Sequence, residues 1–320
     1  MPTKLGLRGR PVTTLLRSAT LWTTGLSPVR RAITGTRLGR RLGGRFVAGD
    51  GLEDGMDAAR ALNAQGIAAM LDHLGENVES PAQAAAAADA YIRALKRIRE
   101  SPELDCNISV KLTQLGLDAS TDLCVENMER VLQVASEADP ATLVMIDMEA
   151  SEYVERTLTV YISLRDRFPA VGVCLQSYLY RTAGDVARIA GPAAIVRMAK
   201  GAYLEPASIA HQRQAQVRRS FAHLVATLLS SGSVVHFATH DPRLVEGAKR
   251  FVRGRGLPKE RYEFQMLYGI RRDLQSALVS EGEPVRVYIP YGTQWYPYLT
   301  RRLAERPANI WFFLSNLVRR

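Results

Sequence analysis

The stretch VRVYIPYGTQWYPYLTRRLAERPAN, residues 285–309, shows in one place how this chain is built. It opens with a short run of β-branched and aromatic residues, which is typical of a strand. Pro290 and Gly292 are turn residues that end this strand, and the helical pattern that follows runs to Pro307, which ends or kinks a helix. A short apolar strand followed by a helix is the repeating unit of parallel α/β proteins.

The same unit recurs through the rest of the sequence. The strand-like runs are residues 66–71, 108–112, 143–147, 171–176, 194–198, 233–238, 263–267 and 285–289. The clearest helical patterns between them are residues 82–99, 125–138, 209–229 and 241–253. Nearly continuous apolar runs are typical of parallel strands covered on both faces. Eight such units over about 250 residues predict a distorted (β/α)8 barrel of the TIM type.

A doubly wound open sheet is the alternative fold. It would need a glycine-rich phosphate-binding turn after its first strand, and the sequence DHLGE at residues 72–76 matches one poorly. The barrel therefore remains the predicted architecture.

The positive charge of the chain lies at its N-terminus. Lys and Arg number 42 against 32 Asp and Glu, which gives a formal net charge of +10, and no acidic residue precedes Asp50. A basic, amphipathic arm suits an anionic membrane surface, whereas a nucleic-acid protein more often carries its basic patch on the folded domain. We predict a basic helical arm over residues 1–66, with helices near 15–26, 28–42 and 52–64, and a barrel over residues 67–320. We expect no nucleic-acid partner.

The cysteines and the apolar segments indicate which cellular compartment the protein occupies. Cys106, Cys124 and Cys174 are isolated in the sequence, which indicates a reducing environment. Residues 222–239 lack Lys, Arg, Asp and Glu, but a Ser-Ser-Gly-Ser turn interrupts them, so they predict a helix end and a strand. The acid-free first 49 residues also resemble a transit peptide in composition, so a mitochondrial matrix location is the alternative to a bacterial cytoplasm.

Polar residues gather where the predicted strands end. The active site of such a barrel lies at the C-terminal ends of its strands. The polar candidates there are Asp72, His73, Lys111, Asp147, Gln176, Arg197, Lys200, Thr239, His240, Gln265, Tyr268 and Tyr288. Each also fits a structural role; Lys111 and Asp147, for example, could simply bridge two strands.

Arg301 and Arg302 lie on the helix that follows the last strand. Arg301 and Glu305 form an i,i+4 pair, so one guanidinium is braced while the other points elsewhere. Two adjacent guanidiniums suit a carboxylate, which arginine binds with two parallel hydrogen bonds. A solvated helix face is the simpler interpretation, but the nearby aromatic residues favour a pocket wall.

A metal-dependent hydrolase is the alternative function on the same fold. His236 and His240 are four residues apart on a predicted strand, so both would point to one side. His236 also fits a satisfied core histidine, and no ligand pair on the first strand supports the two histidines. A mouth that carries Arg197, Lys200 and the arginine pair suits a diphosphate and a carboxylate better than a cation. We therefore predict no metal site.

Six short segments together resemble proline dehydrogenases. They are SVKL at 109–112, IDME at 146–149, RMAKGAY at 197–203, ATH at 238–240, FQMLYG at 264–269 and YLTRRL at 298–303. The resemblance extends in order over about residues 47–313. We expect the monofunctional bacterial type, because no aldehyde dehydrogenase module follows the barrel.

The resemblance implies an enzyme that oxidises L-proline to 1-pyrroline-5-carboxylate. FAD would accept the hydride, and the reduced flavin would pass its electrons to a membrane quinone. The protein would then be cytoplasmic and peripherally associated with the inner membrane.

The motif positions also imply roles for single residues. Arg301 and Arg302 would hold the proline carboxylate, with Lys111 helping from the opposite wall. Asp147, which would orient Lys111, and Arg197, which would lie near the flavin N5, are the catalytic candidates. The residues implied in the pocket wall are Tyr203, Leu267 and Tyr288. Those implied in cofactor binding are Met148, Gln176, Arg197, Lys200, Gly201, Ala202, Thr239 and His240. Leu204 stands where some relatives place Trp.

Overall fold

The computed structural model describes residues 45–75, 78–192 and 194–295. The chain divides into two compact units, Val47–Thr293 and a second that combines Met1–Phe46 with Gln294–Arg320. The predicted helices at 15–26 and 28–42, and the predicted helix that carries Arg301 and Arg302, lie outside the described residues.

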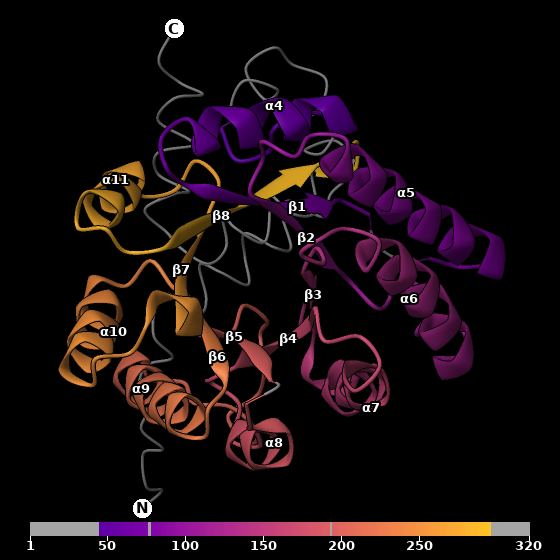
Figure 1. The fold of residues 1–320 in the computed structure, drawn as a ribbon. Coiled ribbons are helices and arrows are strands. Elements are labelled where there is room, and N and C mark those ends of the chain that lie inside the picture. Colours follow the sequence, from indigo (N-terminus) through magenta and orange to yellow (C-terminus); the bar gives the residue numbers. More distant parts are fainter. Residues whose placement is uncertain (1–44, 76–77, 193, 296–320) are drawn as a thin grey trace, which may run out of the picture. The chain divides into compact units, whose positions relative to one another are not determined.

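Eight parallel strands close into a barrel in their sequence order (Figure 1). The strands are β1 Ala68–His73, β2 Cys106–Val110, β3 Val144–Ile146, β4 Val171–Gln176, β5 Ile195–Ala199, β6 Val234–Ala238, β7 Tyr262–Leu267 and β8 Val285–Tyr291. The barrel closes where β1 pairs with β8, with Met70 opposite Tyr288. The predicted (β/α)8 barrel is confirmed, and each of the eight apolar runs overlaps a strand.

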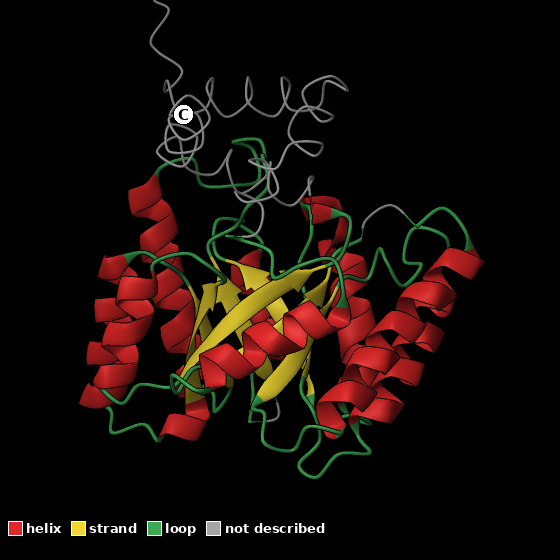
Figure 2. Ribbon diagram, turned by 90° about the horizontal axis from the view of Figure 1, so that it is seen from above, coloured by secondary structure: helices red, strands yellow, loops and turns green. Residues whose placement is uncertain are grey.

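Helices surround the strands, as Figure 2 shows with the strands in yellow at the centre. They are α4 Leu52–Asn63, α5 Pro81–Arg99, α6 Thr121–Ala135, α7 Val154–Arg165, α8 Thr182–Ile189, α9 Gln214–Ser230, α10 Pro242–Gly254 and α11 Arg272–Ser280, with 3-10 turns at Ser151–Tyr153 and Lys259–Arg261. Helix α6 begins four residues earlier than predicted, because the Ser120 side chain caps it by accepting from the backbone N–H of Asp122. Helix α9 begins five residues later than predicted, because the preceding residues pair with the loop after β4: Tyr180 N–H donates to the Ile209 carbonyl.

Helix α4 covers the seam between β1 and β8 (Figure 1). Its Gly55 lies so close to the barrel that an added Cβ would be 3.1 Å from the Leu71 side chain and 3.3 Å from the Tyr291 ring. Met56 of the same helix is fully buried in the core. Although its residues fall within the predicted N-terminal segment 1–66, α4 therefore packs as part of the barrel unit.

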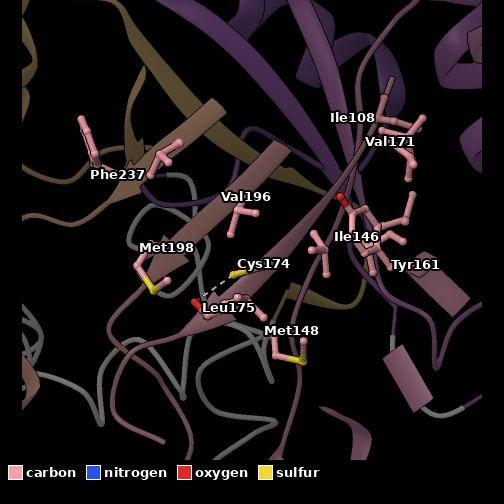
Figure 3. Close-up of a cluster of buried hydrophobic side chains, with 14 of the residues drawn as sticks. Ile108, Ile146, Met148, Tyr161, Val171, Cys174, Leu175, Val196, Met198 and Phe237 are labelled. Atoms are coloured by element: carbon pink, nitrogen blue, oxygen red, sulfur yellow. Dashed lines mark hydrogen bonds between the residues drawn. The ribbon is translucent and has the colours of Figure 1, made fainter. Parts of the chain in front are cut away.

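The apolar core lies between the strands and the helices, whereas the interior of the barrel is polar. Figure 3 shows part of this core, with Ile146 and Val171 from adjacent strands near Tyr161 of α7. Successive side chains of a strand point to opposite faces. Ser109, Arg197 and Gln265 consequently point into the barrel, where Arg197 donates to both of the others. A polar interior positions the site described next.

Candidate active site

Lys111 lies at the centre of a polar cluster at the C-terminal ends of β1, β2, β3 and β8. Its Nζ is 2.8 Å from Asp72 Oδ1, 3.4 Å from Asp147 Oδ2 and 3.3 Å from the Tyr288 hydroxyl. Lys111 and Asp147 follow directly after β2 and β3, so the parallel register brings their side chains to one edge. We call Asp72, Lys111, Asp147, Tyr288 and Arg197 the mouth cluster.

Asp147 connects the two halves of the mouth cluster. Its Oδ2 accepts a 2.7 Å hydrogen bond from the Tyr288 hydroxyl. Its Oδ1 accepts bonds of 2.6 Å from Ser109 Oγ and 2.6 Å from Arg197 Nη1. The Arg197 guanidinium also lies 5.4 Å from the centre of the Tyr288 ring, within the range of a cation–π contact. Three strands, β2, β5 and β8, thus donate hydrogen bonds to one largely buried carboxylate that follows β3.

Burial and neighbouring charges shift the pKa values of Asp147, Lys111 and Tyr288. Burial alone would raise the pKa of Asp147, but Lys111 and Arg197 outweigh it and hold the pKa below its usual value. Burial would likewise lower the pKa of Lys111, yet Asp72, Tyr288 and Asp147 raise it well above its usual value. Burial, followed by Asp147, raises the pKa of the Tyr288 hydroxyl. Asp147 is therefore an anion, Lys111 a cation and Tyr288 a neutral donor.

The cations of the described mouth are paired with carboxylates. Asp72 and Asp147 face Lys111 and Arg197, and Asp241 Oδ2 lies 3.6 Å from both Lys200 Nζ and Arg218 Nη1. Arg301 and Arg302, the other two cations of the predicted positive mouth, lie outside the described residues.

Gln176 offers the clearest unused acceptor at the mouth. Its Nε2 donates to the Met148 and Glu149 carbonyls at 3.2 and 3.1 Å. Its Oε1 is buried and has no hydrogen-bond partner among the described residues. The Glu149 carboxylate fixes this backbone by accepting from Thr113 N–H and Oγ1. A buried acceptor without a donor is costly, so Gln176 Oε1 suits a ligand N–H.

The other residues predicted to bind a cofactor lie at the ends of β5 and β6. Gly201 has φ +115, and a Cβ there would lie 2.2 Å from the Tyr178 ring, so only glycine fits this position. Ala202 and Tyr203, which follow it, are half-buried. Thr239 Oγ1 accepts from Asp241 N–H at the start of α10.

His240 supports the pocket wall and does not face His236. Its Nε2 accepts from the backbone N–H of Leu267, which is half-buried at the end of β7. Strand β6 ends at Ala238, so His240 lies beyond the strand, and the prediction that both histidines share one face of it was wrong. The His236 ring faces Gln265 instead. Among the residues that the structure describes, no cluster of three or more His, Cys, Asp or Glu could hold a metal ion.

Three residues with roles in this site were missed or left without a role. Ser109 bonds Asp147 and Arg197, Gln265 Oε1 accepts a 2.6 Å bond from Arg197 Nε, and Asp72 pairs with Lys111. Asp72 and Gln265 were recognised only as strand-end candidates. Ser109 was within reach of the sequence, because it precedes Lys111 by two residues and so faces the same side of the chain.

The family model for proline dehydrogenase matches residues 55–313. Proline dehydrogenase 1 of Bacillus subtilis subsp. natto is 40% identical over 286 residues, 89% of this chain and 93% of that protein. The proline dehydrogenase of Deinococcus radiodurans is 41% identical over 280 residues, 86% of this chain and 89% of that protein.

A solved structure of proline utilization A (PutA) from Bdellovibrio bacteriovorus has the same fold. It superposes with a TM-score of 0.79 at 22% identity over 92% of this chain, which spans 36% of that longer protein. The family match covers both the barrel and the mouth cluster, and this chain therefore belongs to the proline dehydrogenase family of oxidoreductases.

Proposed function

We propose that this protein oxidises L-proline to 1-pyrroline-5-carboxylate by hydride transfer to FAD. The observation that carries this proposal is the mouth cluster: a buried lysine and arginine share one carboxylate beside a tyrosine, in a chain of this family. A fixed cation and a tyrosine wall can orient a small amino acid that carries one carboxylate.

The described residues fit a flavin at the mouth. Gln176 Oε1 is a buried acceptor in need of a donor, which suits an N–H of the isoalloxazine ring. Met148, Lys200, Gly201, Ala202, Thr239 and His240 lie around the same strand ends and would complete the cofactor site. When bound, FAD would supply the two-electron acceptor for the hydride. Arg197, as a cation near the ring, would favour the electron-rich reduced form.

The mouth residues would hold the substrate in position and would not transfer its protons. The pKa of Lys111 is raised and that of Asp147 is lowered, so we assign neither residue a proton-transfer step. Lys111 would attract the proline carboxylate, while Asp147 and Asp72 would hold the lysine in place. Tyr288, Tyr203 and Leu267 would shape the pocket around the ring. Hydride transfer needs the reacting atoms about 3–3.5 Å apart in a fixed orientation.

An absorption spectrum tests the proposal directly. The purified protein, supplied with FAD and freed of excess cofactor, is expected to show a flavin spectrum that bleaches without oxygen when L-proline is added. D-proline serves as the control, because its carboxylate cannot occupy the same position with the same C–H directed at the flavin. A protein that retains no FAD, or a flavin that L-proline leaves oxidised, would contradict the proposal.

The proposed arginine clamp has its own test. Arg302→Met is expected to weaken L-proline binding by about 2–5 kcal/mol, because the proposed charged contact to the carboxylate would be lost. The flavin content should stay native, since the clamp would hold the substrate and not the cofactor. Arg219→Met, an exposed arginine on α9, is the matched control. Native proline affinity in Arg302→Met would refute the clamp.

We further propose that a membrane quinone accepts the electrons and that the protein contacts an anionic inner membrane from the cytoplasm. The support is the acid-free N-terminal segment with its ten basic residues. None of the helices in the described part of the chain is long and apolar enough to cross a membrane. Co-sedimentation with anionic liposomes at low salt, and its loss at high salt, is the expected result. No binding at low salt would dismiss the membrane contact.

A further inference from the structure

Arg197 is held on the side away from the mouth by a second group of polar residues. Arg197, His236 and Glu263 are register partners on β5, β6 and β7, so their side chains lie in one row inside the barrel. Gln265 stands one step nearer the mouth on β7, and its Oε1 accepts a 2.6 Å bond from Arg197 Nε. All four side chains are largely buried. We call Gln265, His236 and Glu263 the Gln265 array.

The hydrogen bonds fix which way the Gln265 amide points. Arg197 Nε can only donate, so the amide oxygen has to face it. The amide nitrogen then faces Glu263 Oε1 at 2.8 Å and His236 Nδ1 at 2.9 Å. It has two hydrogens for these two neighbours.

This amide orientation determines the state of His236. Nδ1 has to accept, so the ring is neutral and carries its proton on Nε2. Burial lowers the pKa of His236 to about 4, and the arginines 197 and 286 act in the same direction against Glu263. The ring therefore remains neutral at physiological pH, as the array requires.

We propose that Gln265 is a positioning residue for Arg197, held in its working orientation by Glu263 and a neutral His236. Asp147 holds Arg197 from the mouth at Nη1, and Gln265 holds it from the interior at Nε. These two partners hold the guanidinium from opposite sides, so it cannot turn entirely toward Asp147. The part of this inference that concerns the flavin rests on the proposed function, whereas the state of the array does not.

The first experiment uses the flavin-free protein. Nitrogen-15 NMR of the histidine side chains, with His236→Gln for assignment among the five histidines, is expected to show His236 neutral with its proton on Nε2. The Nε–H of Arg197 should exchange slowly and become fast in Gln265→Leu. In Gln265→Glu a carboxylate oxygen faces Nδ1, so His236 should gain a proton there at pH 7. A native His236 protonated on Nδ1, or a slow Nε–H in Gln265→Leu, overturns the proposal.

The second experiment measures the midpoint potential of the flavin in the FAD-loaded protein, which would not change if Gln265 had only a structural role. Gln265→Leu should make the two-electron midpoint potential of the flavin more negative by about 30 mV, a tenfold change in the redox equilibrium, because the cation is less firmly held. Asn127→Leu on α6, which removes a buried hydrogen bond from the amide to the Leu115 carbonyl, should leave the potential native. A native potential in Gln265→Leu overturns the flavin part. If no variant binds FAD, the result counts against the proposed function. The NMR signals of His236 and of the Arg197 Nε–H still test the hydrogen bonds of the Gln265 array in that case.

Discussion

The two ends of the barrel interior use similar charges in different ways. At the N-terminal ends of the strands, Arg286 Nε bonds both carboxylate oxygens of Glu263 at 3.0 Å. Arg286 Nη1 donates to the Ala69 carbonyl at 2.7 Å and to Asp105 at 2.9 Å. We call Glu263, Arg286 and Asp105 the barrel floor. At the other end, the mouth cluster builds a comparable network around Lys111 and Asp147.

The difference lies in which polar atoms have partners. Both oxygens of Glu263 are bonded on the floor, whereas Asp72 Oδ2 and Gln176 Oε1 at the mouth are buried with no partner in the described part of the chain. Unpaired buried acceptors destabilise a fold unless something donates to them. The floor therefore stabilises the barrel, and the mouth keeps acceptors for a ligand. Removing one charge at each end should show which end the reaction depends on.

The largest effect is expected from Arg286→Met on the floor. Removal of the guanidinium leaves the buried Glu263 carboxylate without its cation, which should lower the free energy of unfolding by about 3–5 kcal/mol. Urea unfolding measures this loss. Arg99→Met, which breaks an exposed pair with Glu137, should cost less than about 1 kcal/mol. Equal losses in the two variants would show that the floor is not the structural end.

Lys111→Met at the mouth should act on catalysis. The cation proposed to attract the proline carboxylate is lost, so kcat/KM for L-proline should fall on the order of 10²-fold or more, corresponding to about 3–5 kcal/mol. Exposed Lys96 on α5 supplies the control Lys96→Met, which should have native kinetics. An active Lys111→Met enzyme with the same kcat/KM would remove the lysine from the proposed substrate site.

The sequence predicted the fold well because the strands contain short apolar runs that stand out from the helical patterns between them. Runs such as residues 171–176 are buried throughout in β4, which makes them visible as continuous apolar segments. Helix starts were less predictable, since they depend on local caps such as Ser120. The loop before α9 looked helical because its pairing partner, the loop after β4, lies far away in sequence.

The site was predictable as a set of residues and not as a set of contacts. Strand-end position alone selected Lys111, Asp147 and Arg197. Which carboxylate each cation binds depends on strand order and register, which place Arg197 of β5 within reach of Asp147 across the barrel. Propensity and spacing carry no such information. The roles of Ser109 and Gln265 follow from the same cross-barrel geometry.

His236, which lies between the two ends, should make the stability depend on pH. Its pKa is about 4 in the folded protein against 6.5 when exposed, with burial as the main cause. The unfolded chain therefore binds the extra proton first, and stability is lost as pH falls from about 6.5 to about 4, by about 3 kcal/mol. Burial also lowers the pKa of His73. The difference in unfolding free energy between the native protein and His236→Gln, measured by urea unfolding at pH 7 and at pH 4.5, isolates the contribution of His236. A pH-independent difference would mean that His236 is protonated in the fold.

The smallest effect compares two tyrosine–carboxylate bonds, one at each end. Tyr288 donates to Asp147 at 2.7 Å in the mouth, and Tyr262 donates to Glu283 at 2.9 Å where β7 begins. Tyr288→Phe and Tyr262→Phe should each lower the unfolding free energy by about 1.5–3 kcal/mol, because each removes a hydrogen bond to a carboxylate.

Only Tyr288→Phe should also raise KM for L-proline, since its hydroxyl contacts Lys111 as well as Asp147. Urea unfolding and steady-state kinetics, measured on both variants, compare their losses of stability and their changes in KM directly. If Tyr262→Phe changed KM as much as Tyr288→Phe, the two ends would be coupled, and the division between a structural floor and a ligand-binding mouth would fail.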